Sequence, residues 1–257
     1  MILYFKQAWQ ILKENKLVII ISITGTALAI ALVMVMFMIF QIRTDNYPPK
    51  TGSDQTLIAS VFSAPKEGMQ GERNNTAFPY PLVKQRVYDL KTPAVVSVFS
   101  NTEENLFSIP TKNLYSNYHI RGTDVNFWKA HRFRFLEGRP FTMEEQDAGI
   151  PLVILSREVA QTLFGNEDAV GQTVEINLEP YKVTGVVENV TRAASFAYAQ
   201  AWVLLTGNPK YTFSKNEDTV GPLTLMLLAK NKKDFPAIRK EIEAVMKQHS
   251  DNNRQYN

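Results

Sequence analysis

Residues 17–42 read LVIIISITGTALAIALVMVMFMIFQI and carry no charged side chain. As an α-helix rising about 1.5 Å per residue, this segment is longer than the roughly 30 Å hydrocarbon core of a bilayer. Apolar residues occupy every side of such a helix, whereas the surface helix of a soluble domain keeps a polar face. We therefore predict a transmembrane helix over residues 17–42. The alternative is a cleaved signal peptide, which the long apolar run and the lack of small residues in Phe40–Arg43 disfavour.

The charges that flank this segment predict its orientation. More positive charge precedes it than follows it, with Lys6, Lys13, Lys16 and Glu14 on one side and Arg43, Asp45 and Lys50 on the other. By the positive-inside rule, the N-terminus lies in the cytoplasm and residues 44–257 lie outside it.

The first sixteen residues predict a second membrane element. Phe5, Trp9 and Leu12 recur at near-helical spacing, which is typical of an amphipathic helix in the membrane interface. An unstructured basic tail is the alternative. Within the span, Ser22, Gly25 and Ala29 form a stripe of small residues where another helix could pack.

Charge and composition exclude several classes of function. The formal net charge of +3 is accounted for by residues 1–43, so the rest of the chain is neutral and lacks the basic surface that nucleic-acid binding requires. The chain has no cysteine, which excludes disulfides, thiolate metal sites and a cysteine nucleophile.

Beyond the span, strand and helix patterns predict an α+β domain. Strands are expected at Thr56–Phe62, Ala94–Ser100 and Leu223–Ala229, and a helix at Pro81–Leu90. Asp234 is expected to cap a C-terminal helix that buries one apolar face, formed by Phe235, Ile238, Ile242, Val245 and Met246. The wide separation of these units predicts that a second lobe is inserted between them.

The middle of the chain carries local signals for helices and a hairpin. Thr142 and Glu145 form a capping box that predicts a helix over Met143–Asp147. After a strand at Leu152–Leu155, we expect a helix that Ser156 caps and Gly165 ends. Its inward face would be Val159, Ala160, Leu163 and Phe164. Alternation predicts a hairpin of Thr173–Leu178 and Tyr181–Val187, with the turn at Glu179-Pro180.

An ordered set of motifs resembles a known family. The motifs are Phe135–Thr142 (FLEGRPFT), Val153–Arg157 (VILSR), Ala160, Leu163–Gly165 (LFG), Gly171 and Tyr181–Val187 (YKVTGVV), with Phe127-Trp128 before them. This order resembles the periplasmic core domain of MacB-like (MacB/FtsX-type) ABC transporter permeases. The positions that carry the family pattern are Gly138, Arg139, Phe141, Thr142, Ser156, Phe164, Gly165, Gly171 and Gly185.

The resemblance implies a domain layout. Residues 1–16 would form a cytoplasmic elbow helix, 17–42 the transmembrane helix and 43–257 the periplasmic core domain. That domain would hold a porter-like, ferredoxin-type lobe (about 54–105 and 205–250) and an inserted mixed α/β lobe (about 106–204). Family members usually continue into three further transmembrane helices, whereas the printed sequence shows no second long apolar run. A truncated permease, a split permease and a single-span relative are therefore all open interpretations.

The resemblance also implies partners and a function. Such permeases reside in the bacterial inner membrane and dimerise, as homo- or heterodimers. They work with a cytoplasmic ABC ATPase and sometimes a periplasmic adaptor, for export of peptides, antibiotics or lipoproteins or for mechanical signalling. The alternative is a single-span anchored binding or scaffold module without transport.

The residues themselves offer little chemistry. No G-x-x-x-x-G-K-[ST] loop is present, so ATP hydrolysis would need a separate subunit. His119, His131 and His249 lack metal-ligand spacing, and Glu144-Glu145 suits the first turn of a helix. Gly138-Arg139 is interpreted as a turn whose arginine is exposed or holds the fold. We expect no catalytic, cofactor-binding or metal-binding residues, and a protein that is not an enzyme.

Overall fold

The computed structural model describes residues 16–44, 55–65, 73–212 and 221–255. The chain divides into two compact units, Met1–Asp45 and Asn46–Asn257, and each is described by itself. The elbow-helix prediction for residues 1–16, with Phe5, Trp9 and Leu12, lies almost wholly outside the described residues.

The first unit contributes one long helix, α2 (Lys16–Thr44). Within it, Ile19–Gln41 is long and apolar enough to cross a membrane, and it is the one such segment in the described part of the chain. Thr24 and Thr26 donate their hydroxyls to the carbonyls of Ile20 and Ser22, each at 2.7 Å, so the helix itself satisfies these polar groups. The apolar helix predicted over residues 17–42 is therefore present.

The second unit is built on a sheet that has ten strands in the described residues. Along the sheet the order is β1 (Thr56–Ala59), β12 (Leu223–Leu228), β4 (Val95–Ser100), β6 (Leu114–Thr123), β11 (Ala201–Leu204), β8 (Leu152–Ser156), β10 (Glu179–Val187), β9 (Thr173–Ile176) and β5 (Glu103–Ile109). A tenth strand, β7 (Phe135–Gly138), pairs with β10. A separate hairpin joins β2 (Phe62–Pro65) to β3 (Arg73–Thr76).

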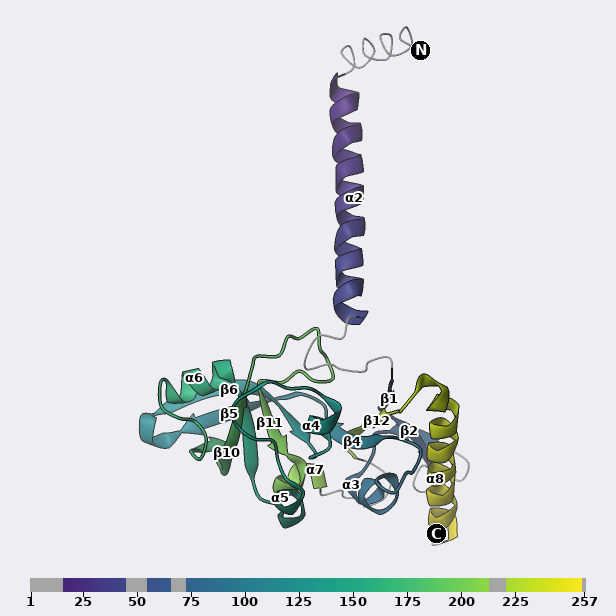
Figure 1. Cartoon of the computed structure of the whole chain (residues 1–257), viewed down its shortest axis with the longest axis vertical. Coiled ribbons are helices and arrows are strands. Elements are labelled where there is room, and N and C mark those ends of the chain that lie inside the picture. Colours follow the sequence, from purple (N-terminus) through teal and green to yellow (C-terminus); the bar gives the residue numbers. More distant parts are fainter. Residues whose placement is uncertain (1–15, 45–54, 66–72, 213–220, 256–257) are drawn as a thin grey trace. The chain divides into compact units, whose positions relative to one another are not determined.

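The sheet closes on itself over part of its width. β5 pairs with β9 and also with β6, so β6, β11, β8, β10, β9 and β5 form a closed ring, which we call the six-strand ring. β1, β12 and β4 extend from it as an open sheet, which we call the three-strand arm. Figure 1 shows the arm beside helix α8 (Phe235–Gln255) and the ring beside helix α6 (Arg157–Phe164). The architecture is mixed α/β, and the predicted lobe boundaries stay a prediction.

Helices cover the sheet and complete its core. Near the arm lie α3 (Tyr80–Leu82), which continues into the π-helical turn η1 (Val83–Val87), and α8, whose Ile238 is fully buried. The Glu241 carboxylate on α8 accepts hydrogen bonds from the amides of Lys91 and Thr92, at 2.8 and 3.1 Å. The remaining short helices are η2 (Pro110–Lys112), α4 (Phe127–Ala130), α5 (Met143–Ala148), η3 (Leu205–Gly207), α7 (Pro209–Thr212) and η4 (Lys232–Asp234).

An aromatic cluster forms a second core around α4. Trp128 makes a T-shaped contact with Phe141, with 5.8 Å between ring centroids, and another with Trp202 at 6.0 Å. His131 lies in the same cluster, 4.6 Å from the ring of Phe127. Such contacts stabilise by apolar burial and ring geometry rather than by charge.

Most local predictions agree with the structure, and three need correction. The strand predicted at Thr56–Phe62 is broken, because the chain leaves the arm at Ser60 and Val61, both exposed, and continues as β2 in another sheet. The hairpin turn lies at Asn177-Leu178 and not at Glu179-Pro180: both turn residues have positive φ (51° and 72°), and Pro180 pairs with Glu175 inside the ladder. Asn231, not Asp234, is the N-cap of the C-terminal helical segment, and the Asp234 carboxylate accepts the Asn231 amide at 3.1 Å.

Candidate functional site

Two of the motif glycines allow β7 and β10 to approach closely. Gly138 has a φ of +67°, and a Cβ there would lie 2.1 Å from the Thr184 carbonyl oxygen. On the facing strand, a Cβ at Gly185 would lie 3.0 Å from the Arg139 carbonyl oxygen. Gly138 and Gly185 are register partners. Because neither residue has a side chain, the two strands can pack closely at this pair.

Arg139 and Thr142 meet at one carboxylate. Glu145 accepts hydrogen bonds from both terminal nitrogens of Arg139, at 2.6 and 3.0 Å, and from the Thr142 amide at 2.8 Å. The Glu145 amide in turn donates to the Thr142 hydroxyl, which completes the predicted capping box of α5. These hydrogen bonds, led by those from Arg139, hold the pKa of Glu145 below its ordinary value. Arg139 therefore forms a partly exposed ion pair with the first turn of α5.

The other motif residues shape the ring and its covering helix. Ser156 caps α6 by accepting the Val159 amide at 3.4 Å, Phe164 is buried, and Gly165 ends the helix with a φ of +66°. Gly171 has a φ of +88°, and its amide donates to the Val183 carbonyl on β10. Phe141 is buried in the aromatic cluster. The motif thus surrounds β10 and the ends of α6, where its members act on backbone geometry and packing.

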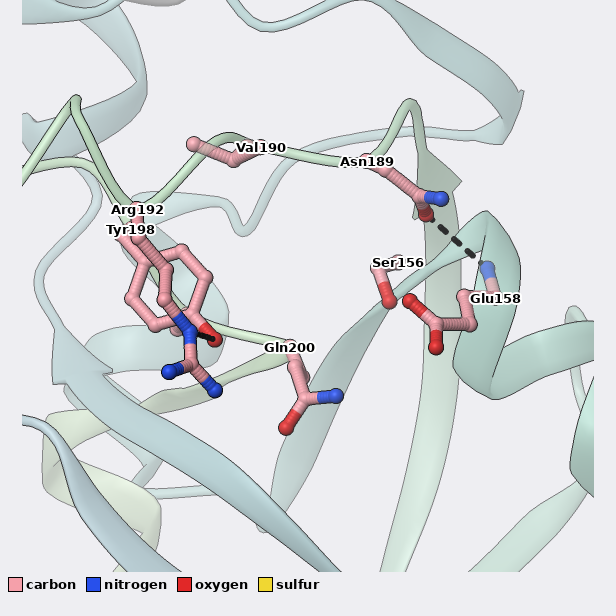
Figure 2. A pocket seen from close by; sticks show the side chains of 8 residues that line it. Ser156, Glu158, Asn189, Val190, Arg192, Tyr198 and Gln200 are labelled. Atoms are coloured by element: carbon pink, nitrogen blue, oxygen red, sulfur yellow. Dashed lines mark hydrogen bonds between the residues drawn. The ribbon is translucent and has the colours of Figure 1, made fainter.

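A surface pocket lies beside these elements. Its volume is about 270 Å³, and its lining comes from the ends of β8 and β10, the start of α6 and the segment that leads into β11: Ser156, Glu158, Asn189, Val190, Arg192, Tyr198, Ala199 and Gln200. In Figure 2 the Arg192 guanidinium and the Gln200 amide lie on one side, and the Glu158 carboxylate lies beside Ser156 on the other.

Hydrogen bonds within the lining fix much of the pocket. Asn189 Oδ1 accepts the Glu158 amide at 3.0 Å, which the dashed line in Figure 2 marks. Arg192 Nε donates to the Tyr198 hydroxyl at 3.2 Å, and the guanidinium lies 5.7 Å from the centre of that ring. Gln200 Oε1 accepts the amide of His119 at 3.0 Å. These hydrogen bonds fix the walls of the pocket, and the charged ends of Glu158 and Arg192 are exposed.

Charged side chains also flank the pocket. Glu188 lies 3.1 Å from a terminal nitrogen of Arg134 and 3.8 Å from one of Arg157, all partly exposed to solvent. Exposed pairs of this kind contribute about 0–1 kcal/mol each. Among the described residues, no group of three or more His, Asp or Glu side chains is placed to hold a metal ion. The lining of the pocket is therefore mainly polar and charged.

The structure does not gather the three histidines. His119 lies on β6, His131 lies in the aromatic cluster and His249 lies on α8. The stripe of Ser22, Gly25 and Ala29 lies on α2, where a Cβ at Gly25 would meet no atom within 4 Å. Packing of this stripe against another helix stays a prediction.

Sequence reasoning missed two buried charges. Arg121 and Asp124 are only 4% and 1% exposed, at the end of β6 and just after it. Arg121 donates to the carbonyls of Tyr198 and Ser195, at 3.2 and 3.0 Å, and so fixes the segment that forms one pocket wall. The signal that could have found them is the pair of charges in IRGTDV, where the flanking residues predict a buried strand.

Comparison with known families identifies one match over most of the chain. The family model described as the MacB-like periplasmic core domain matches residues 19–245.

Among curated proteins, two kinds of relative are similar to the chain. The macrolide export ATP-binding/permease protein MacB of Aggregatibacter actinomycetemcomitans is 24% identical over 99 residues, which are 38% of this chain and 15% of that protein. The uncharacterized ABC transporter permease YknZ of Bacillus subtilis is 22% identical over 155 residues, which are 54% of this chain and 39% of that protein. The chain therefore matches well under half the length of either relative.

Solved structures show the same fold. The periplasmic region of MacB from Actinobacillus actinomycetemcomitans superimposes with a TM-score of 0.56 at 16% identity, covering 79% of this chain and 92% of that one. The extracellular domain of YknZ, a transporter of Gram-positive bacteria, gives a TM-score of 0.56 at 16% identity, covering 77% and 95%. At this identity the similarity concerns the fold alone.

Proposed function

We propose that this chain, which belongs to the MacB-like periplasmic core domain family, is a permease-type subunit of an ABC transporter. In this role it couples ATP hydrolysis by a separate cytoplasmic subunit to motion of its extracytoplasmic domain. The observation that carries the proposal is the family match, which runs from the apolar helix through the mixed α/β domain. The similarity to ABC transporter permeases supports it further.

The proposed topology follows from the apolar helix and its flanking charges. Residues 1–16 form a cytoplasmic elbow helix, residues 17–42 cross the bacterial inner membrane and residues 43–257 lie outside the cytoplasm. The extracytoplasmic part consists of a porter-like lobe (about 54–105 and 205–250) and an inserted lobe (about 106–204). The three-strand arm with α8 and the six-strand ring support this division, because their strands fall largely on either side of these boundaries.

The proposed partners are a cytoplasmic ABC ATPase, a second permease copy or homologue, and a periplasmic adaptor. The stripe of Ser22, Gly25 and Ala29 is the surface of α2 that we expect to pack against a partner helix, because small side chains let helix backbones approach closely. Export and mechanical signalling are both compatible with such an assembly.

The decisive experiment is a native pull-down of the full chain from detergent-solubilised membranes, with partners and the intact mass of the bait read by mass spectrometry. Recovery of an ATP-binding subunit is expected. A matched bait that carries the same residues 1–50 on an unrelated domain controls for capture by the membrane segment alone.

Recovery of the chain without any ATPase would contradict the proposal and favour the alternative, a single-span anchored binding or scaffold module. A Gly25→Leu variant then tests the helix surface, since a bulky side chain would prevent close packing. Unchanged recovery of the partners by Gly25→Leu would show that the stripe is not the contact.

A further inference from the structure

The three-strand arm and the six-strand ring meet at a narrow junction. The ladder between β4 and β6 contains a single register pair, Phe99 with Thr123. Both strands lie wholly within the residues that the structure describes. By comparison, β12 and β4 share six register pairs within the arm. A junction with so little strand pairing would bend easily unless other contacts hold it.

Asp124 supplies such contacts. Its carboxylate accepts four hydrogen bonds: from the Ser97 hydroxyl at 2.7 Å, the Tyr88 hydroxyl at 3.0 Å, the Val98 amide at 3.1 Å and the Phe127 amide at 2.8 Å. These donors belong to β4, to the end of η1 and to α4, so one side chain joins three elements. The Asp124 amide also donates to the Val98 carbonyl at 3.2 Å.

Arg121 and Gly122 reinforce the junction on the other side of the Phe99–Thr123 pair. Arg121 donates to the Ser100 carbonyl at 3.0 Å and to the Thr102 hydroxyl at 2.6 Å, and its guanidinium lies 4.9 Å from the centre of the Phe99 ring. The Gly122 amide donates to the Ser100 hydroxyl at 2.8 Å. Side chains and isolated amides therefore add polar contacts between β4 and β6 to the apolar cores that the arm and the ring share.

These contacts cannot be exchanged for water while the junction stays closed. Asp124 is 1% exposed, and a rotation of the arm against the ring would leave a buried charge without its donors. Burial raises the pKa of Asp124 to about 6 although all four hydrogen bonds oppose that rise, so the charge is costly where it lies. A buried charge that lowers stability yet fixes several elements is suited to specifying geometry.

We infer that Asp124 locks the three-strand arm and the six-strand ring into one rigid body, so that a displacement of the arm moves the ring as a whole. Asp124 acts here as a positioning residue. The inference concerns the domain itself and holds whether or not the proposed ATPase coupling is correct.

Distances between spin labels on the two parts test this rigidity. The chain has no cysteine, so Lys240→Cys on α8 and Gln161→Cys on α6, both exposed, can be labelled in the full chain without background. Pulsed electron paramagnetic resonance should give one narrow distance distribution. Asp124→Asn should broaden it or add a second population, because an amide cannot accept all four hydrogen bonds.

Two comparisons separate rigidity from stability. Ser108→Ala removes a buried hydroxyl that donates to Glu175 at 2.9 Å inside the ring, and it should leave the distribution unchanged even if it lowers the melting temperature. Tyr88→Phe removes only the 3.0 Å hydrogen bond to Asp124 and should broaden the distribution less than Asp124→Asn. If Asp124→Asn does not fold, the distance distribution of Tyr88→Phe tests the inference in its place.

Two results would overturn the inference. One is a broad distribution in the unmutated chain, which would make the junction a hinge. The other is a folded Asp124→Asn variant, or Tyr88→Phe in its place, with the same narrow distribution as Ser108→Ala.

Discussion

Asp124 in the junction and Glu145 in the family motif are both carboxylates with several hydrogen bonds, yet their pKa values shift in opposite directions. Burial raises the pKa of Asp124, whose four donors carry no formal charge, whereas the Arg139 guanidinium lowers the pKa of Glu145. Glu145 keeps contact with solvent and Asp124 does not. Hydrogen bonds alone therefore do not determine the direction of a pKa shift. Desolvation raises the pKa of a carboxylate, and a cationic partner lowers it.

The largest expected effect is a pH dependence that comes from the junction. The pKa of Asp124 in the folded protein lies above its ordinary value, so the folded state binds this proton more tightly than the unfolded state. Its contribution to stability is therefore greatest below pH 4 and is lost as the pH rises through about 6, by on the order of 3 kcal/mol.

Denaturant unfolding of the wild type and of Asp124→Asn between pH 4 and 7.5 measures this effect. The wild type should lose stability relative to the variant as the pH rises. Tyr88 and Tyr80, which face Asp124, stay neutral over this range because burial and Asp124 raise both pKa values. A constant difference between the two proteins would mean that Asp124 does not titrate in this range.

The second prediction compares two glycines of the family motif, Gly138 and Gly165, which have nearly equal φ. Gly138→Ala should destabilise the domain by about 2 kcal/mol, whereas we expect Gly165→Ala to cost about 1 kcal/mol. The reason is steric: a Cβ at Gly138 would overlap the Thr184 carbonyl, whereas a Cβ at Gly165 would meet no atom within 4 Å. Thermal unfolding of both variants provides the measurement, and equal costs would show that only φ matters at Gly138.

The smallest effect is expected at the surface pair. Arg139→Ala should lower the free energy of unfolding by only about 0.5 kcal/mol, because solvent screens an exposed ion pair. The pH dependence has the opposite sign to that of Asp124: the pair stabilises above the ordinary pKa of Glu145, and this contribution is lost as the pH falls through its lowered value. A loss larger than that of Gly138→Ala in the same unfolding assay would reverse the comparison.

Local signals in the sequence were sufficient to predict helix caps, because a cap depends on residues that are close together in the chain. The Thr142–Glu145 capping box, the Ser156 cap and the glycine that ends α6 all lie where the pattern placed them. The hairpin turn was misplaced by two residues, since positive φ at Asn177 and Leu178 satisfies the turn while Pro180 remains in the ladder. Local signals of this kind predict the type of element reliably and its exact boundaries less reliably.

By itself, the sequence determined the apolar helix, the caps of the middle helices and the family motif, because each depends on spacing along a few turns or one strand. Only the tertiary structure decided that β5 closes the ring between β6 and β9, that loop residues 189–200 form a pocket wall, and that Asp124 joins β4, η1 and α4. These features depend on pairing between segments far apart in the chain. The cost of burying Arg121 and Asp124 is set by neighbours that the local pattern does not reveal.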